Sequence, residues 1–145
     1  MSCESDTATS LRDAGQKVTP QRMLILSAVR HRREHVTAGA VIDDVRRAYP
    51  FIDASTVYRT LSAARDLRLV SEAYMGGETQ FEWIGNAEPH HHLICRICSS
   101  VSSLESSYVD GLASIILEQE GFTADLGHFS IFGVCRDCSV RGPTE

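Results

Sequence analysis

The first half of the chain repeats apolar residues at the spacing of amphipathic helices. The first such run has its apolar positions at Leu24, Ile25, Ala28 and Val29. It follows Thr19-Pro20, which favours a helix start because threonine caps free amides and proline is tolerated at the first helical position. The pattern predicts a helix over residues 20–30, a second that Thr37 caps and that ends before Pro50, and a third that Asp53 caps. The inward positions of the last two are Val41, Ile42, Val45 and Tyr49, then Val57, Leu61, Ala64 and Leu67.

The period of the pattern changes after these helices. Residues 68–74 and 79–84 are rich in valine, tyrosine, phenylalanine and tryptophan, and they flank the turn-forming segment 75–78. This arrangement predicts a two-stranded hairpin. Short helices followed by a hairpin are typical of the winged helix-turn-helix, in which the helix that begins near Ala54 would enter the major groove of DNA.

The second half of the chain predicts a smaller mixed unit. The histidine run 90–92 favours the start of a strand, residues 106–120 carry apolar side chains at helical spacing, and residues 129–134 favour another strand. The expected fold class is therefore α+β, with a winged helix-turn-helix domain followed by a small α/β domain. We predict the first domain over residues 1–85, a hinge over 86–89 and the second domain over 90–145.

Composition and charge sharpen this division. The chain has 145 residues, 43% hydrophobic and 23% charged, which is typical of a protein with its own core. Residues 1–84 carry 11 basic and 11 acidic side chains, whereas residues 85–145 carry three and eight, which accounts for the net charge of −5. Within the first part, the stretch from residue 10 to residue 68 has a net charge of +5. Because the sequence has neither a signal peptide nor a membrane span, we expect a cytoplasmic protein without a membrane partner.

The helix expected to enter the groove carries side chains suited to DNA. Hydroxyls, a phenol and a guanidinium hydrogen-bond phosphates and base edges, and here they belong to Ser55, Thr56, Tyr58 and Arg59. Lys17 and Arg22 are predicted to contact backbone phosphates. A protein-docking module with a basic face is the alternative interpretation.

Two Cys-x-x-Cys pairs form the most specific chemical pattern in the chain. The first pair is Cys95 and Cys98, the second is Cys135 and Cys138, and two such turns can supply four thiolates to one tetrahedral zinc ion. Such a closed site predicts a structural zinc, with a redox dithiol or disulfides as alternatives. The fifth cysteine, Cys3, lies in an acidic segment expected to be a tail that needs no partner.

Nitrogen and oxygen ligands for a second metal lie near the predicted hinge. In a strand, His90 and His92 point to one face and His91 to the other. His35 and Glu82 are available from the first module, so these two with His90 and His92 would join the modules through one ion. Such ligands suit iron, manganese, nickel or zinc. A histidine run that is only a polar strand start is the alternative.

These residues together resemble the ferric uptake regulator (Fur) family of metal-responsive bacterial repressors, over roughly residues 11–139. The segments that carry the resemblance are Val18–Arg22, Ser55–Leu61, His90–Cys98 and Ile131–Cys138. The resemblance implies a winged-helix DNA-binding domain and a C-terminal dimerisation domain with structural zinc on the four cysteines. It also implies a regulatory metal at the hinge, on positions that match His35, Glu82, His90 and His92.

Further ligands follow from the same resemblance. The family often has a carboxylate at the position of Ser103, and this serine argues against a peroxide sensor. Glu105 is a candidate ligand nearby, but it lies about 6–7 Å further along a strand, so it could replace that carboxylate only with a local shift. His128 resembles a ligand of a further family site, and His91 is an additional nitrogen donor. Residues 124–142 resemble the nickel-responsive (Nur) branch in particular.

The sequence therefore predicts a homodimeric, metal-dependent transcriptional repressor that binds a palindromic double-stranded DNA operator. Zinc is the expected structural ion, and Fe²⁺, Mn²⁺, Ni²⁺ or Zn²⁺ the regulatory one. An enzyme is not expected, because the sequence has neither a His-Glu-x-x-His nor a Gly-x-Ser-x-Gly motif. A zinc-stabilised protein-interaction adaptor and a dithiol redox enzyme are the alternative functions.

Overall fold

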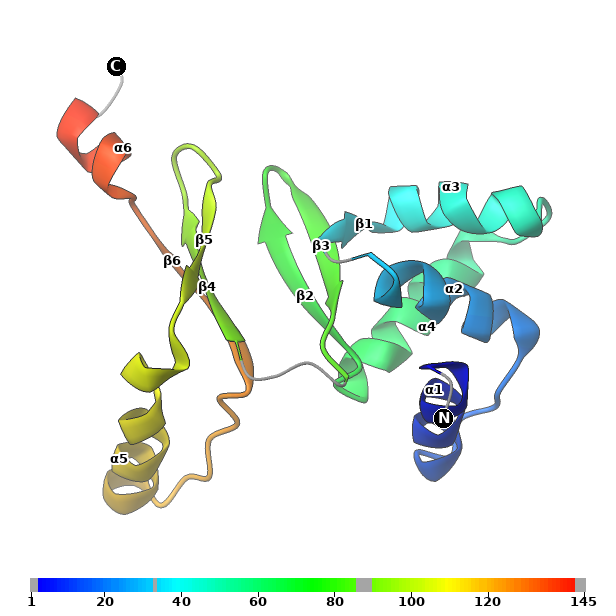
Figure 1. The fold of residues 1–145 in the computed structure, drawn as a ribbon, viewed down its shortest axis with the longest axis horizontal. Coiled ribbons are helices and arrows are strands. Elements are labelled where there is room, and N and C mark those ends of the chain that lie inside the picture. Colours follow the sequence, from blue (N-terminus) through cyan, green and yellow to red (C-terminus); the bar gives the residue numbers. More distant parts are fainter. Residues whose placement is uncertain (1–2, 33, 86–89, 143–145) are drawn as a thin grey trace. The chain divides into compact units, whose positions relative to one another are not determined.

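The computed structural model describes residues 3–32, 34–85 and 90–142 (Figure 1). The chain divides into two compact units, residues 1–86 and 87–145. The predicted hinge, residues 86–89, lies outside the described residues. No helix in the described ranges combines the length and the apolar character that crossing a membrane requires.

The first unit is a helix-turn-helix with a three-stranded sheet. Its helices are α1 (Cys3–Asp13), α2 (Pro20–Arg30), α3 (Ala38–Ala48) and α4 (Ala54–Asp66), and its strands are β1 (Val36–Thr37), β2 (Val70–Met75) and β3 (Glu78–Trp83). The sheet is antiparallel in the order β1-β3-β2. Gly76 and Gly77 form the two-residue turn between β2 and β3 with φ of 61° and 89°, which favours glycine at both positions. The predicted hairpin is therefore the wing of this unit.

Two of the three residues predicted to cap helices do so with their side chains. Thr19 Oγ1 accepts a hydrogen bond from Arg22 N over 3.2 Å at the start of α2. Thr37 Oγ1 does the same for Ala40 N over 3.1 Å at the start of α3. The side chain of Asp53 makes no cap hydrogen bond at the start of α4, so the prediction of a side-chain cap there was wrong.

One hydrophobic core holds the first unit together. Its residues come from every helix and from the sheet, and the most buried are Ile25, Leu26, Val29, Val41, Val45, Val57, Leu61 and Val70. Tyr49 was predicted to face this core, but α3 ends at Ala48 and the Tyr49 side chain is exposed. The expected N-terminal tail is instead α1, which buries Ala8 and Leu11.

The second unit is a three-stranded sheet with helices at its connections. Its elements are β4 (His90–Cys95), β5 (Val101–Leu104), the 3-10 helix η1 (Ser106–Tyr108), α5 (Asp110–Glu120), β6 (His128–Gly133) and α6 (Arg136–Arg141). The sheet order is β5-β4-β6, with β4 antiparallel to β5 and parallel to β6. The helix predicted over residues 106–120 is therefore two elements, and the short α6 was not predicted.

Packing within the second unit leaves much apolar surface uncovered. None of the residues of α5 is buried, although the helix was predicted from its apolar positions. Large exposed hydrophobic residues of α5 and the segment after it are Leu112, Ile115, Leu117 and Phe122, and those of the sheet and its ends are Leu93, Val101, Ile131, Phe132 and Val134. Apolar side chains left uncovered on a helix and on a sheet are typical of surfaces that bind another protein.

Candidate functional site

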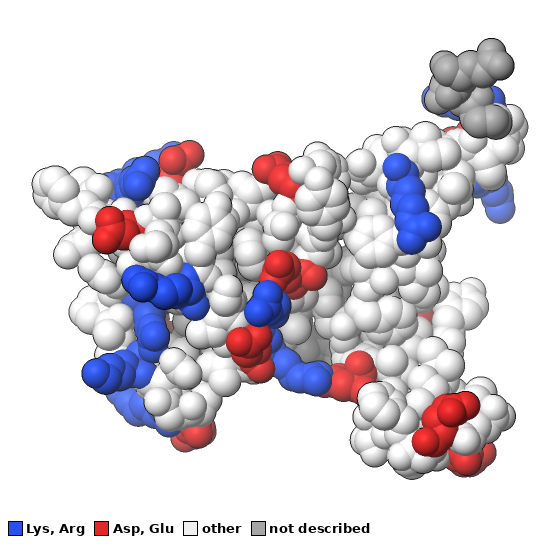
Figure 2. All heavy atoms as spheres, turned by 180° about the vertical axis from the view of Figure 1, so that it is seen from behind, with Lys and Arg blue, Asp and Glu red and all other residues white. Residues whose placement is uncertain are grey.

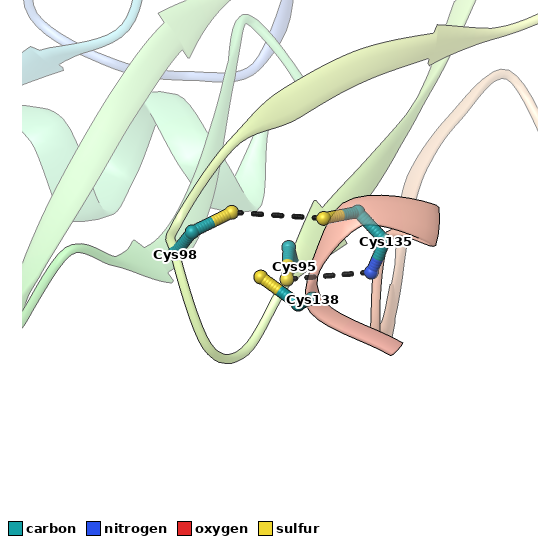
Figure 3. A group of neighbouring side chains, drawn as sticks. All are labelled: Cys95, Cys98, Cys135 and Cys138. Atoms are coloured by element: carbon teal, nitrogen blue, oxygen red, sulfur yellow. Dashed lines mark hydrogen bonds between the residues drawn. The ribbon is translucent and has the colours of Figure 1, made fainter. Parts of the chain in front are cut away.

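The four cysteines come together at one end of the β4–β6 pair. Cys95 ends β4, Cys98 lies in the turn that follows, Cys135 precedes α6 and Cys138 belongs to it. Their sulfur atoms point toward one another and lie within 4.8 Å of each other (Figure 3). The Sγ atoms of Cys98 and Cys135 are 3.8 Å apart. Thiolates at 2.3 Å from a tetrahedral zinc ion would lie about 3.8 Å apart, so the group fits zinc.

Hydrogen bonds already favour the thiolate form of two of these cysteines. The amides of Cys135 and Ile97 each donate to Cys95 Sγ over 3.4 Å, and such backbone bonds, that of Cys135 first, lower the pKa of Cys95 to about 6. The hydrogen bond between Ser100 and Cys98, 3.1 Å long, lowers the pKa of Cys98. By contrast, the neighbouring Cys135 thiol and burial raise the pKa of Cys138 to about 12. Four adjacent thiolates repel one another, so all four can ionise together only when a cation lies among them. A zinc ion supplies that positive charge.

Three histidines gather at the opposite end of the same strand pair. His90 lies opposite His128 in the parallel register, and His92 points to the same side as His90 because side chains alternate along a strand. The Nε2 atoms of His92 and His128 are 3.1 Å apart, and ring nitrogens of all three residues lie within 4.8 Å of one another. Two nitrogens bound at 2.0–2.1 Å to one metal lie about 2.9–3.4 Å apart. The separation of His92 and His128 therefore fits two ligands of one divalent cation, and His90 lies near enough to be a candidate for a third.

The structure separates His91 and Glu105 from this group. His91 is 1% exposed and its ring lies 4.4 Å from that of Phe129. Burial first, then the charges of His128 and His90, lower the pKa of His91. Glu105 follows the last residue of β5 and is exposed. Within the described residues, neither side chain joins the three histidines.

The first unit holds the other two predicted ligands side by side. Val36 in β1 pairs with Phe81 in β3, which places the preceding residue, His35, next to Glu82. His35 Nε2 and Glu82 Oε2 are 3.2 Å apart, and only 16% and 15% of the two side chains are exposed. A nitrogen and a carboxylate oxygen thus converge at the edge strand, as they would in half of a metal site.

Helix α4, which is the helix predicted to enter the major groove and is called the reading helix below, presents a polar face. Ser55, Tyr58 and Arg59 are exposed, while Thr56 is half-buried and its Oγ1 accepts a hydrogen bond from Arg59 Nη2 over 3.4 Å. Figure 2 shows that most Lys and Arg side chains on the visible face belong to the first unit. These groups can donate to phosphates and base edges.

Arg22, a predicted phosphate ligand, makes two hydrogen bonds within the first unit. Its Nη1 donates to Lys17 O over 2.9 Å and to Gln16 Oε1 over 3.2 Å. Arg22 therefore fixes the loop before α2, and Lys17 is carried on that loop.

Sequence reasoning missed two residues of interest. Ser100 bonds to Cys98, and its place two residues after a Cys-x-x-Cys pair was the available signal. Phe51 is exposed between α3 and α4, where a polar turn residue is usual.

Comparisons with known proteins agree with this arrangement. The model of the Ferric uptake regulator family matches residues 13–131. The peroxide-responsive repressor PerR of Staphylococcus epidermidis is 27% identical over 138 residues, which cover 94% of this chain and 91% of that protein. The ferric uptake regulator from Pseudomonas aeruginosa, solved with manganese, has a TM-score of 0.72 at 24% identity and covers 93% of this chain and 99% of that one. A zinc uptake regulator complexed with zinc and DNA has a TM-score of 0.61 at 19% identity, over 95% and 93% of the two chains. These likenesses confirm the predicted fold class.

Proposed function

The chain belongs to the ferric uptake regulator family, and on that premise we propose that it binds a palindromic operator as a homodimer, with the sensed metal between its two units. Membership makes the chain a metal-responsive, DNA-binding transcriptional regulator and not an enzyme. Its cofactors are a structural zinc ion and a second, regulatory divalent metal. The positions of both metals, the dimer and the operator are the parts proposed here.

The structural zinc is assigned to the four cysteines. The observation that supports this assignment is the 3.8 Å between the sulfurs of Cys98 and Cys135, the separation expected around tetrahedral zinc. The site is closed by four protein ligands, so it would cross-link the end of β4 to the start of α6 without offering a position for chemistry.

The regulatory metal is assigned to His35 and Glu82 of the first unit together with His90 and His92 of the second. The observation that carries this assignment is that each unit brings its own ligands together: His35 lies 3.2 Å from Glu82, and His92 is grouped with His90 and His128. We include His128 as a fifth ligand because its Nε2 is 3.1 Å from that of His92. Ligands drawn from both units would link their relative orientation to metal occupancy.

The homodimer is assigned to the second unit. Its helix α5 has no buried residue, and Leu112, Ile115 and Phe122 leave an apolar surface that a second copy would cover. Two copies related by a two-fold axis would present two reading helices to successive major grooves, which is why we expect a palindromic operator. As a regulator of bacterial type that binds DNA, the protein is expected to act in the cytoplasm.

The identity of the sensed metal stays a prediction, and so does the likeness to the nickel-responsive branch. Imidazole nitrogens with one carboxylate accept Fe²⁺, Mn²⁺, Ni²⁺ and Zn²⁺, with affinities that follow the general order of these ions. Competition among the four ions in a DNA-binding assay would rank them.

One experiment tests the regulatory site. Duplex DNA selected from a random pool by the wild-type protein in Mn²⁺ serves as the probe. The double variant His90→Ala, His92→Ala is expected to lose metal-dependent binding while it keeps its four-cysteine zinc and its dimer. The control is His31→Ala, because His31 is an exposed histidine at the end of α2. A double variant that still responds to metal would show that the ligands lie elsewhere.

A further inference from the structure

The turn between α3 and α4 has an aromatic side chain at its corner. Ile52 N donates to Tyr49 O over 3.3 Å, which closes a four-residue turn with Pro50 and Phe51 at the two central positions. Proline suits the first of these positions, whereas glycine or a short polar residue is usual at the second. Phe51 is 91% exposed, the largest exposed fraction among the large hydrophobic residues of the described ranges.

The residues around Phe51 fix where its ring lies. Ile52 is 3% exposed and belongs to the core of the first unit. Asp53 follows at the start of α4, and its carbonyl accepts a hydrogen bond from Thr56 N over 3.0 Å. With Ile52 buried on one side of the turn, Phe51 stands in solvent at the N-terminal edge of the reading helix.

The exposed side chains of α4 differ in chemistry from Phe51. Ser55, Arg59 and Ser62 offer hydroxyl and guanidinium groups, and Tyr58 adds a phenol. These groups recognise the hydrogen-bonding edges of bases. The major groove also displays one apolar group, the C5 methyl group of thymine, which apolar side chains such as phenylalanine contact. Of the exposed residues at this end of α4, Phe51 is the one with that chemistry.

We propose that Phe51 is a specificity-determining residue that contacts the C5 methyl group of a thymine next to the bases faced by α4. The proposal rests on the proposed DNA binding by this helix. The N-terminal residues of a reading helix contact base edges, and Phe51 precedes the first residue of α4, Ala54, by three positions. Covering one methyl group changes affinity about fourfold, and about 15-fold when both halves of a palindrome are changed.

The test removes the methyl group from the DNA and the ring from the protein. The probe is the duplex selected from a random pool by the wild-type protein in Mn²⁺, with each thymine pair of the two half-sites replaced in turn by deoxyuridine, which lacks only the methyl group. At one thymine position we expect the wild type to lose about 15-fold in affinity and Phe51→Ser to bind both duplexes equally. Phe51→Leu, which keeps an apolar side chain, should retain part of the discrimination.

Two controls separate this contact from other effects. Arg59→Ala should weaken binding to the thymine and deoxyuridine duplexes by the same factor. The zinc content and thermal unfolding of Phe51→Ser should match the wild type, because the replaced side chain is exposed.

Each outcome decides the proposal. Affinity of Phe51→Ser equal to that of the wild type on every duplex overturns it, and so does a loss that does not depend on the methyl group at any position. A wild-type protein that selects no DNA in the presence of metal would instead refute the proposed DNA binding, and this inference with it.

Discussion

In the first unit every helix contributes side chains to one hydrophobic core, whereas in the second unit the longest helix, α5, buries none of its residues. The first unit contains the residues expected to touch DNA, on a scaffold whose stability comes from burial of apolar surface. The second unit contains a four-cysteine group and three clustered histidines, and many of its large apolar side chains are exposed. In the proposed homodimer with zinc on the four cysteines, the metal ion and the second copy would supply the stability that the first unit draws from its own core.

Removal of zinc should have the largest effect, because it should unfold one unit and leave the other folded. In the variant Cys95→Ser, Cys138→Ser, the second unit should lose its folded structure while the first keeps its own, because structural zinc contributes about 10–16 kcal/mol in small zinc domains. Amide hydrogen exchange, resolved by peptides from each unit, measures the two separately. Equal loss of protection in both units would contradict the independence of the first.

Truncations of one apolar residue in each unit should give different readouts. Leu61 is fully buried in the first core, so Leu61→Ala should lower the free energy of unfolding by about 3 kcal/mol. Ile115 on α5 is exposed, so Ile115→Ala should change the unfolding of the monomer by less than about 0.5 kcal/mol but weaken the dimer. Denaturation and sedimentation over a range of concentrations distinguish the two. A dimer unaffected by Ile115→Ala would place the contact surface elsewhere.

Acid should destabilise the second unit through His91. Burial lowers the pKa of His91, so the native state binds this proton less readily than the unfolded chain does. The stability that comes from keeping His91 neutral is fully present above the ordinary histidine pKa of about 6.5. It is lost as the pH falls from there toward the lower native pKa, and the loss is about 1.4 kcal/mol for each unit by which the two pKa values differ. His91→Phe, a ring of similar size beside Phe129, should therefore flatten the dependence of unfolding free energy on pH between about pH 6.5 and 5.5 in zinc-loaded protein. An unchanged slope would assign the effect to other histidines.

The smallest expected change concerns the turn after the first cysteine pair. Ser99 has a φ of 59°, a left-handed conformation that glycine adopts without steric cost. Ser99→Gly should therefore stabilise the second unit by about 0.5 kcal/mol, and the first unit should not change. The matched control is Ser102→Gly, which places glycine inside the extended strand β5 and should destabilise the unit by a similar amount. Thermal unfolding of the two variants should shift in opposite directions.

The sequence predicted the first unit better than the second, for physical reasons. Thr19 and Thr37 cap helices whose apolar residues face a core formed by the same unit, so local pattern and tertiary packing agree. Helix α1 was missed because its buried face consists of few residues, chiefly Ala8 and Leu11, in an otherwise polar segment. The apolar spacing in α5 predicted the helix but not that its apolar residues would be exposed, because a pattern does not reveal which molecule covers it.

The candidate site divides in the same way. The spacing of the cysteines was enough to predict a four-sulfur group, because two Cys-x-x-Cys turns commonly supply the four ligands of one zinc ion. The sequence suggested His128 only through its family resemblance, because its approach to His92 depends on the parallel pairing of β4 with β6, whose partner residues lie 38 positions apart in the chain. Strand register determines which residue of one strand lies beside a metal ligand on the next, and register depends on tertiary structure.

The parallel pairing of β4 with β6 also implies an order in which the two metals can be loaded. His90 lies opposite His128 at one end of the pair and Cys95 opposite Gly133 at the other, five residues or about 16 Å away. A slip of one residue would place Phe129 opposite His90 and turn His128 to the other face of the sheet. Zinc on the proposed four-cysteine site would oppose that slip from a distance. We therefore expect zinc to be acquired first, and the apparent affinity for the sensed metal to depend on how much zinc a preparation already contains.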